Sequence, residues 1–210
     1  MNKIDKEMIK CPECGAENHV TIWNSIDSNV DLFAKKELMN GDLFRRVCDG
    51  CGCTFNVFFE LMYQDVNHNV IIYLVKQDDV NETIDMLNKA NAKMQIPTNG
   101  VRSRVVCTLN DLREKVNIFE NNLNDKVIEI IKLLYLTNIT DNNPHLKIED
   151  VRFIVQDGKY ILQFFGNESA DVEITKEFYD DVEKEYENEI RHKKKSYVID
   201  REWAIDALMS

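Results

Sequence analysis

The sequence is poor in glycine and proline, with 7 and 3 of these residues among 210. This scarcity argues against a disordered chain and favours a folded protein that contains helices. The sequence also lacks any apolar run close to the roughly 18 residues that a membrane-spanning helix requires. Residues 1–7 lack the apolar segment of a signal peptide, so we expect a cytoplasmic protein that makes no membrane contact.

Positive charge is also scarce. The chain has 26 Lys and Arg residues against 37 Asp and Glu, which gives a formal net charge of −11. Residues 1–76, 77–150 and 151–210 are each net acidic. Because affinity for DNA or RNA depends mainly on neutralising phosphates, this balance disfavours a nucleic-acid partner. The one basic run, residues 191–195, follows an acidic helical pattern and is interpreted as a solvated helix end, where cations are favourable.

Against this background, two cysteine pairs stand out. Each has the form C-x-x-C-G, and cytoplasmic cysteines serve more often as metal ligands or buried thiols than as disulfides. Two such hairpins supply the four thiolates of a tetrahedral zinc site, and the glycine after each pair permits the tight turn. We therefore predict a structural Zn²⁺ site with these ligands: Cys11, Cys14, Cys48 and Cys51.

Other cysteine chemistries are less consistent with this pattern. Cys11-Pro12-Glu13-Cys14 has the spacing of a thiol redox pair, but such a pair needs a helix N-terminus beneath its first sulfur, and here a strand pattern follows. A catalytic zinc needs an open coordination position, which four cysteines do not leave. We predict no catalytic residues and no cofactor-binding residues beyond the metal ligands.

Nearby residues carry further expectations. Cys53, one residue past the glycine of the second pair, is expected to point away from the metal, although it is an alternative ligand. Cys107 has no partner in the sequence and is interpreted as a buried apolar group. The cations of Lys10, Arg45 and Arg46 precede the two pairs and are expected to offset the thiolate charge.

The hydrophobic periodicity predicts an α+β protein. Strand patterns cover residues 19–26, 54–63, 70–75, 101–107, 150–156 and 159–165, with a tight turn at Asp157-Gly158. Helical patterns begin at residue 31, at residue 79 or 81, at residue 108, after the polar residues 120–122, and at residues 175 and 200, and the helix over 175–190 is strongly acidic. We expect three parts: a zinc-ribbon-like antiparallel β domain over 1–76, a helical region packed on it over 77–140, and a C-terminal β-hairpin with helices over 141–210.

The cysteine pairs and their surroundings resemble the CpXC domain, a bacterial and archaeal family without an assigned function. The resemblance rests on the first pair, on residues 38–44 before the second pair, and on residues 60–65 and 112–119; it covers roughly residues 8–135. Asp49-Gly50 stands where the family tends to have proline after the first cysteine. The resemblance implies a zinc-ribbon-like N-terminal part and supplies no catalytic residues.

The sequence thus favours a non-enzymatic protein-interaction or regulatory adaptor whose partner is another protein. Two alternatives stay open. One is a nucleic-acid-associated zinc-ribbon regulator that uses a local patch of Lys35, Lys36, Arg45 and Arg46. The other is a thiol redox enzyme, or another enzyme, whose site is built from residues distant in the sequence. The sequence leaves the oligomeric state undetermined.

Overall fold

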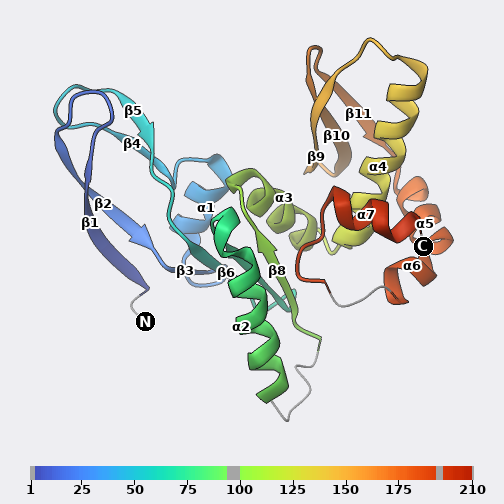
Figure 1. Cartoon of the computed structure of the whole chain (residues 1–210), viewed down its shortest axis with the longest axis horizontal. Coiled ribbons are helices and arrows are strands. Elements are labelled where there is room, and N and C mark those ends of the chain that lie inside the picture. The colour runs from blue at the N-terminus through green and yellow to red at the C-terminus, as the bar shows by residue number, and fades with distance from the viewer. Residues whose placement is uncertain (1–2, 94–99, 193–195, 210) are drawn as a thin grey trace. The chain divides into compact units, whose positions relative to one another are not determined.

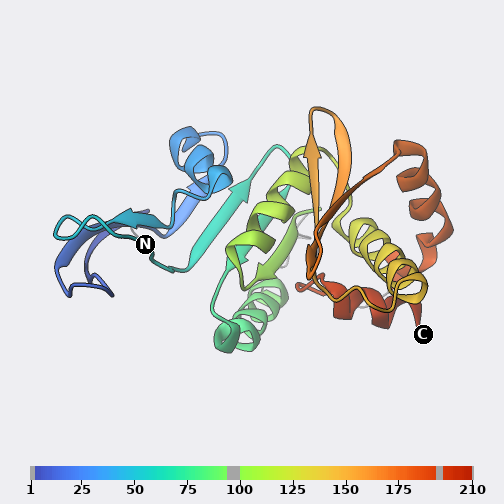
Figure 2. The same cartoon turned by 90° about the horizontal axis from the view of Figure 1, so that it is seen from above.

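The computed structural model describes residues 3–93, 100–192 and 196–209. By its internal contacts the chain divides into two units, Met1–Arg113 and Glu114–Ser210. Each unit combines helices with antiparallel strand pairs, so the α+β class predicted from the sequence is confirmed (Figures 1 and 2). The three-part division at residues 76 and 140 stays a prediction. Within the described residues, no helix is long and apolar enough to cross a membrane.

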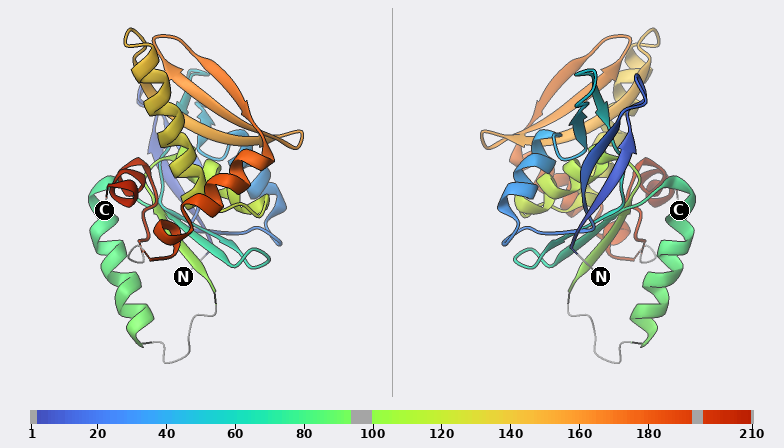
Figure 3. Two further views of the ribbon diagram at one scale, coloured as in Figure 1. Left: turned by 90° about the vertical axis from the view of Figure 1, so that its right-hand side faces the viewer. Right: turned by 90° about the vertical axis from the view of Figure 1, so that its left-hand side faces the viewer.

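Two hairpins carry the cysteine pairs of unit 1. Strands β1 (Ile4–Lys10) and β2 (Glu17–Trp23) pair antiparallel around the first cysteine pair, and β4 (Arg45–Val47) and β5 (Thr54–Asn56) pair around the second. The first hairpin is drawn in dark blue in the right-hand view of Figure 3. The N-terminal antiparallel sheet expected from the sequence is therefore present, with β1 as a strand that the sequence did not predict.

A four-stranded sheet, in the order β3-β6-β7-β8, forms the rest of the unit 1 core. Its strands are β3 (Ser25–Asp27), β6 (Leu61–Asp65), β7 (Val70–Leu74) and β8 (Arg102–Val106). The β6–β7 hairpin confirms the predicted turn between these strands, and alternate residues of both are buried. The strand expected over 54–63 is wrong as a single element, because β5 ends at Asn56 and β6 begins at Leu61.

The helices of unit 1 follow the predicted signals. Helix α1 (Leu32–Asn40) ends at Gly41, whose φ of 84° gives the left-handed cap that a side chain would resist. A short 3₁₀ turn, η1 (Gln77–Asp79), leads into α2 (Val80–Lys93), which contacts β8. Helix α3 (Leu109–Glu120) starts in unit 1 and ends in unit 2. It begins with the predicted cap, since the Thr108 hydroxyl accepts a hydrogen bond from the amide of Asp111 at 3.1 Å.

Unit 2 contains a three-stranded antiparallel sheet in the order β11-β10-β9. Its strands are β9 (Ile148–Gln156), β10 (Lys159–Gly166) and β11 (Ala170–Ile174). The predicted turn at Asp157-Gly158 is confirmed, because both residues have positive φ, as a type I′ turn requires. Strand β11 was not predicted. This sheet is drawn in orange and brown in Figure 1.

Helices complete unit 2. Helix α4 (Asp125–Asn142) contacts β9, α5 and α7. The acidic helix expected over 175–190 is divided into α5 (Lys176–Glu185) and α6 (Glu187–His192), because Tyr186 leaves the helical conformation with φ −103° and ψ 25°. Helix α7 (Arg201–Leu208) begins at the predicted cap, where Asp200 accepts a hydrogen bond from the Trp203 amide at 2.9 Å.

A buried charge network ties α3 to α4 inside unit 2. The Lys115 ammonium lies 3.1 Å from a Glu129 oxygen and 3.4 Å from an Asp125 oxygen, and Lys115 is only 3% exposed. Lys132 lies 2.9 Å from Glu114 and 3.2 Å from Glu129. Burial is the main influence on the Glu114 carboxyl and raises its pKa, even though Lys132 opposes this effect. These charges must stay paired, because an unpaired charge in such a site is costly.

The buried phenol of Tyr179 gives unit 2 a dependence on alkaline pH. Its oxygen accepts a hydrogen bond from the Asn124 amide at 2.9 Å, and burial raises the pKa of Tyr179 to about 12. The ordinary tyrosine pKa is about 10, so the phenol contributes stability below pH 10 that is lost between pH 10 and 12. We expect the free energy of unfolding to fall by about 1.4 kcal/mol per pH unit in this range from Tyr179 alone.

Urea denaturation of the wild type and of Tyr179→Phe between pH 9 and 11.5 measures this contribution. The raised pKa of Lys132 adds to the same alkaline loss in both proteins, so it cancels in the comparison. The variant should be less stable at pH 9, where the Asn124 amide loses its acceptor, and should then lose stability less steeply. Equal slopes for the two proteins would exclude the assigned role of Tyr179.

Candidate metal centre

The two cysteine pairs form a pair of matching turns. In the first, the amides of Cys11 and Gly15 bond to the carbonyls of Ala16 and Cys11 at 2.9 and 3.0 Å. In the second, Cys48 and Gly52 bond in the same way to Cys53 and Cys48, at 2.8 and 2.9 Å. Gly15 and Gly52 have φ of 72° and 73°. The predicted need for glycine at these two positions is confirmed, because the left-handed region disfavours side chains.

Amide donors point at the first sulfur of each turn. The Glu13 amide lies 3.4 Å from the Cys11 sulfur, and the Gly50 amide lies 3.3 Å from the Cys48 sulfur. Both sulfurs belong to buried cysteines, whereas Cys14 and Cys51 are exposed. Each turn thus presents one buried and one exposed thiol, with backbone dipoles that stabilise negative charge on the buried one.

The sulfurs of the two turns lie against each other. The Sγ atoms of Cys11 and Cys51 are 3.8 Å apart, and those of Cys14 and Cys48 are 3.6 Å apart. Four sulfurs at about 2.3 Å from one metal ion in a tetrahedron are separated by about 3.8 Å. The structure therefore places Cys11 beside Cys51 and Cys14 beside Cys48 at separations that suit thiolates on one metal ion, whereas the group of four sulfurs that lie mutually within 4.8 Å contains Cys53 and not Cys14. That these four are the ligands stays a prediction.

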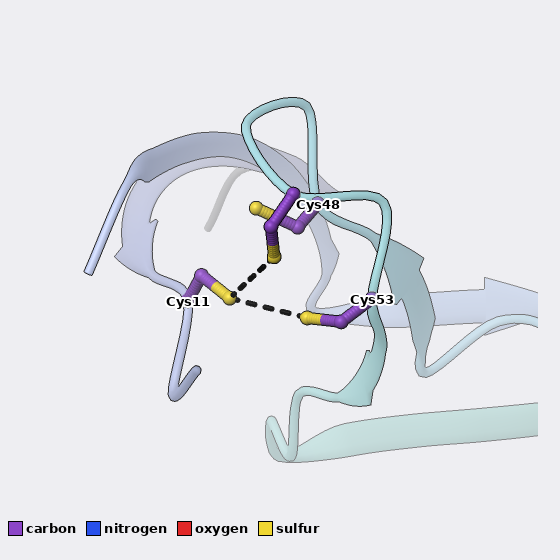
Figure 4. Close-up of side chains that lie close together, drawn as sticks. Cys11, Cys48 and Cys53 are labelled. Carbon is purple, nitrogen blue, oxygen red and sulfur yellow. Dashed lines mark hydrogen bonds between the residues drawn. The ribbon is translucent and has the colours of Figure 1, made fainter. Parts of the chain in front are cut away.

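Cys53 is also part of this cluster. Its Sγ lies 3.2 Å from that of Cys11, and Figure 4 shows these two sulfurs facing each other beside Cys48. The sulfurs of Cys11, Cys48, Cys51 and Cys53 all lie within 4.8 Å of one another. The expectation that Cys53 points away from the metal is therefore wrong. Cys53 occupies the position in the second turn that Ala16 occupies in the first, and both side chains point toward the opposite turn. The direction of the Cys53 side chain depends on the position of the other turn, so the sequence of one turn alone could not predict it.

The pKa values of the two buried thiols are depressed. The amide of Cys14 is the main cause for Cys11 and, against the effect of burial, lowers its pKa to about 6. The amide of Cys51 has the same effect on Cys48, whose pKa also falls below its ordinary range. Without metal, Cys11 is therefore a thiolate at neutral pH, the form that binds metal.

The exposed thiols behave in the opposite way. The Ala16 amide lowers the pKa of Cys14, but the thiols of Cys51 and Cys48 outweigh it, and the pKa rises to about 12. The backbone amide of Cys53 is the largest single influence on Cys51 and lowers its pKa. The thiols of Cys53 and Cys48, together with burial, outweigh this effect, so the pKa of Cys51 rises to about 11. Metal binding by these two thiols must therefore release protons at neutral pH.

Asn18 connects the two turns and was missed by the sequence reasoning. Its side-chain amide donates to the Ala16 carbonyl at 2.8 Å, and its side-chain oxygen accepts from the Asp49 amide at 2.9 Å. The same amide nitrogen lies 3.8 Å from the Cys48 sulfur. A buried asparagine inside a strand is uncommon, and its place four residues after Cys14 was the available signal.

Arg45 and Arg46, two of the three expected cations, make contacts away from the sulfurs. Arg45 pairs with Asp42 at 3.2 Å, and Arg46 donates to the carbonyls of Thr21 and Arg45. The guanidinium groups therefore fasten the second hairpin to β2 and to the loop before it. Backbone and Asn18 amides, rather than arginine, are the donors that the structure places against the sulfurs.

Gly50 is where the two turns touch. A Cβ added to Gly50 would lie 2.9 Å from the Cβ of Ala16, closer than side chains tolerate, and within 3.7 Å of two sulfurs.

We expect Gly50→Ala to lower the stability of unit 1 by about 1–3 kcal/mol and to weaken metal binding, because the turns must separate. Thermal unfolding and a chelator competition measure both effects. Asp49→Ala, at an exposed side chain in the same turn, is the matched control, and an equal effect of both variants would contradict this account.

Comparisons with known proteins give one match. The chain matches the CpXC protein family over residues 9–132, more than half of its length. This stretch includes both cysteine turns and ends within α4, so it agrees with the range expected from the sequence. Searches of the curated proteins and of the solved structures found no match. The cysteine turns and the extent of this match place the chain in the CpXC family.

Proposed function

We propose that the cysteine cluster holds one structural Zn²⁺ ion and that the protein is a non-enzymatic adaptor. The observation that carries the metal proposal is the pair of matching turns, which bring cysteine sulfurs to separations of 3.6 and 3.8 Å. These values suit tetrahedral Zn–S bonds of about 2.3 Å. A donor set of cysteines alone is typical of structural rather than catalytic zinc.

The local fold favours this proposal over thiol redox chemistry. The first cysteine pair lies between β1 and β2, so no helix begins beneath the sulfur of Cys11. The redox proteins that use such a pair place the reactive thiol at a helix N-terminus. Both pairs also contribute sulfurs to one cluster, which a single redox pair would not require.

Metal analysis of the purified full-length protein tests the zinc proposal. We expect the protein to be purified with about one equivalent of zinc per chain, without added metal. A strong chelator should remove this zinc, and the two hairpins should then lose their ordered structure. Less than about half an equivalent, with hairpins that stay folded after treatment with the chelator, would exclude a structural zinc site. Circular dichroism and elemental analysis on the same samples give the two readouts.

The adaptor role rests on an exposed apolar surface in unit 1. Val30, just before α1, is 70% exposed, and Leu32 and Phe33, the first two residues of α1, are 65% and 71% exposed. Apolar side chains grouped in this way commonly mark a surface that binds another protein. Affinity capture from the native cell with the wild type and with Phe33→Ser tests this role. A protein retained by the wild type and lost with the variant supports it, and identical capture by both excludes this surface.

A further inference from the structure

The cysteine cluster contains five thiols, one more than a tetrahedral ion can bind. Cys11, Cys48 and Cys51 lie within 4.8 Å of one another and of Cys53, and the Cys14 sulfur lies 3.6 Å from that of Cys48. Zinc and similar divalent ions take four thiolates. One of the five therefore remains a thiol when such an ion is bound.

The two matching turns identify which thiol is additional. They are related by an approximate twofold symmetry, since their amide bonds agree within 0.1 Å and the sulfur pairs Cys11–Cys51 and Cys14–Cys48 correspond. Under this symmetry Cys53 corresponds to Ala16. Ala16 packs beside Gly50, near the sulfurs of the opposite turn, and Cys53 makes the equivalent approach with a sulfur of its own.

We propose that Cys14 and Cys53 compete for one coordination position, while Cys11, Cys48 and Cys51 stay bound. This inference rests on the proposed metal site. The two alternative ligand sets then share three sulfurs and differ only in the fourth. The set with Cys53 is the group whose four sulfurs lie within 4.8 Å of one another, and Figure 4 shows three of its members, Cys11, Cys48 and Cys53. The Cys14 side chain is exposed, so it can swing outward when it is not bound.

The exchange is balanced in atoms and charge. The bond between the metal and the Cys14 sulfur breaks as the bond to the Cys53 sulfur forms. The proton leaves the Cys53 thiol and ends on the Cys14 sulfur, and no electron is transferred. When Cys53 is the unbound thiol, its S–H can donate to the Cys11 sulfur at the 3.2 Å separation seen here.

Metal binding by four full-length proteins tests the exchange. These are the wild type, Cys14→Ser, Cys53→Ala and Cys14→Ser/Cys53→Ala, loaded with Zn²⁺ for affinity and with Co²⁺ as a spectroscopic probe. Cys53→Ala installs the residue found at the equivalent position of the first turn, so it should bind as the wild type does. We expect Cys14→Ser to lose about tenfold or less in affinity, and the double variant to lose about 100-fold or more.

The Co²⁺ spectrum counts the bound thiolates, because its sulfur-to-metal absorption grows with their number. Cys14→Ser should keep the four-thiolate intensity, and the double variant should fall to that of three. If Cys14→Ser and the double variant have the same metal affinity and the same Co²⁺ spectrum while the wild type binds metal, the proposed exchange is wrong. The proposed metal site is then still supported. If the wild type binds no metal, the proposed site itself is wrong.

A measurement on the unmodified protein guards against misfolded variants. Brief alkylation of the zinc-loaded wild type with iodoacetamide, followed by peptide mass spectrometry, locates the thiol that is free. Apart from any label on Cys107, which lies outside the cluster, protein labelled once within the cluster should carry the label on Cys14 in some molecules and on Cys53 in others. Labelling of only one of these two cysteines would overturn the exchange, because it would show one fixed set of ligands.

Discussion

Cys48→Ser is expected to abolish binding of the proposed Zn²⁺ ion and to unfold both cysteine hairpins. Cys48 is 2% exposed, and its sulfur receives the Gly50 amide and lies 3.6 Å from the Cys14 sulfur. A structural zinc ion contributes about 10–16 kcal/mol in small zinc peptides, which is comparable to the stability of about 5–15 kcal/mol of a whole domain. A serine oxygen cannot replace this thiolate, so the metal-dependent part of unit 1 should lose its fold.

Elemental analysis and hydrogen exchange followed by mass spectrometry measure these effects. The amides of β1, β2, β4 and β5 should exchange rapidly in the variant, as they should in wild type treated with a chelator. Cys107→Ser is the matched control, because it removes a thiol that is not part of the cluster. Slow exchange and a full equivalent of zinc in Cys48→Ser would refute the assigned role of the metal.

Lys115→Met is expected to destabilise unit 2 by about 3–5 kcal/mol. The Lys115 ammonium lies between Asp125 and Glu129, which are 0% and 4% exposed. Its removal leaves two buried carboxylates without enough positive charge beside them. The free-energy penalty of these uncompensated charges is much larger than the net stabilisation that the intact ion pair provides. Methionine keeps most of the side-chain volume, so the loss reports charge rather than packing.

Urea denaturation followed by Trp203 fluorescence, in a Trp23→Phe background, measures this loss. Lys176→Met is the matched control, because the exposed Lys176 pairs with Asp180 at 2.7 Å, and a solvated ion pair of this kind contributes little to stability. Restoring neutrality with Glu129→Gln should recover part of the stability of Lys115→Met. If both lysine variants unfold at the same urea concentration, the buried network has no special role.

Local signals predicted the parts of the fold that depend on neighbouring residues. Gly41 ends α1, Thr108 and Asp200 cap their helices, and Asp157-Gly158 forms its turn, each because a few adjacent residues determine the backbone. The cysteine turns belong to the same class. Their amide bonds stay within six residues, so the C-x-x-C-G pattern was sufficient to predict them.

Features that depend on distant residues were not predictable in this way. Strand β1 is exposed along most of its length, so it shows no hydrophobic alternation, and only its pairing with β2 makes it a strand. Cys53 points into the cluster because the other turn lies there. Lys115 and Glu129 have the charges of a solvated helix face, and only the packing of α3 on α4 buries them.

The two hairpins have a further consequence for the topology of the chain. A metal ion that joins Cys14 to Cys48 closes a loop that contains β3 and α1, which supply no sulfur. Closing a loop lowers the conformational entropy of the segment inside it, even while that segment is unfolded. Helix α1 should therefore open more readily once the metal is gone, although it lies outside the site. Its apolar residues would then be presented on a less ordered segment, so metal supply would set the state of the surface that we propose to bind a partner protein.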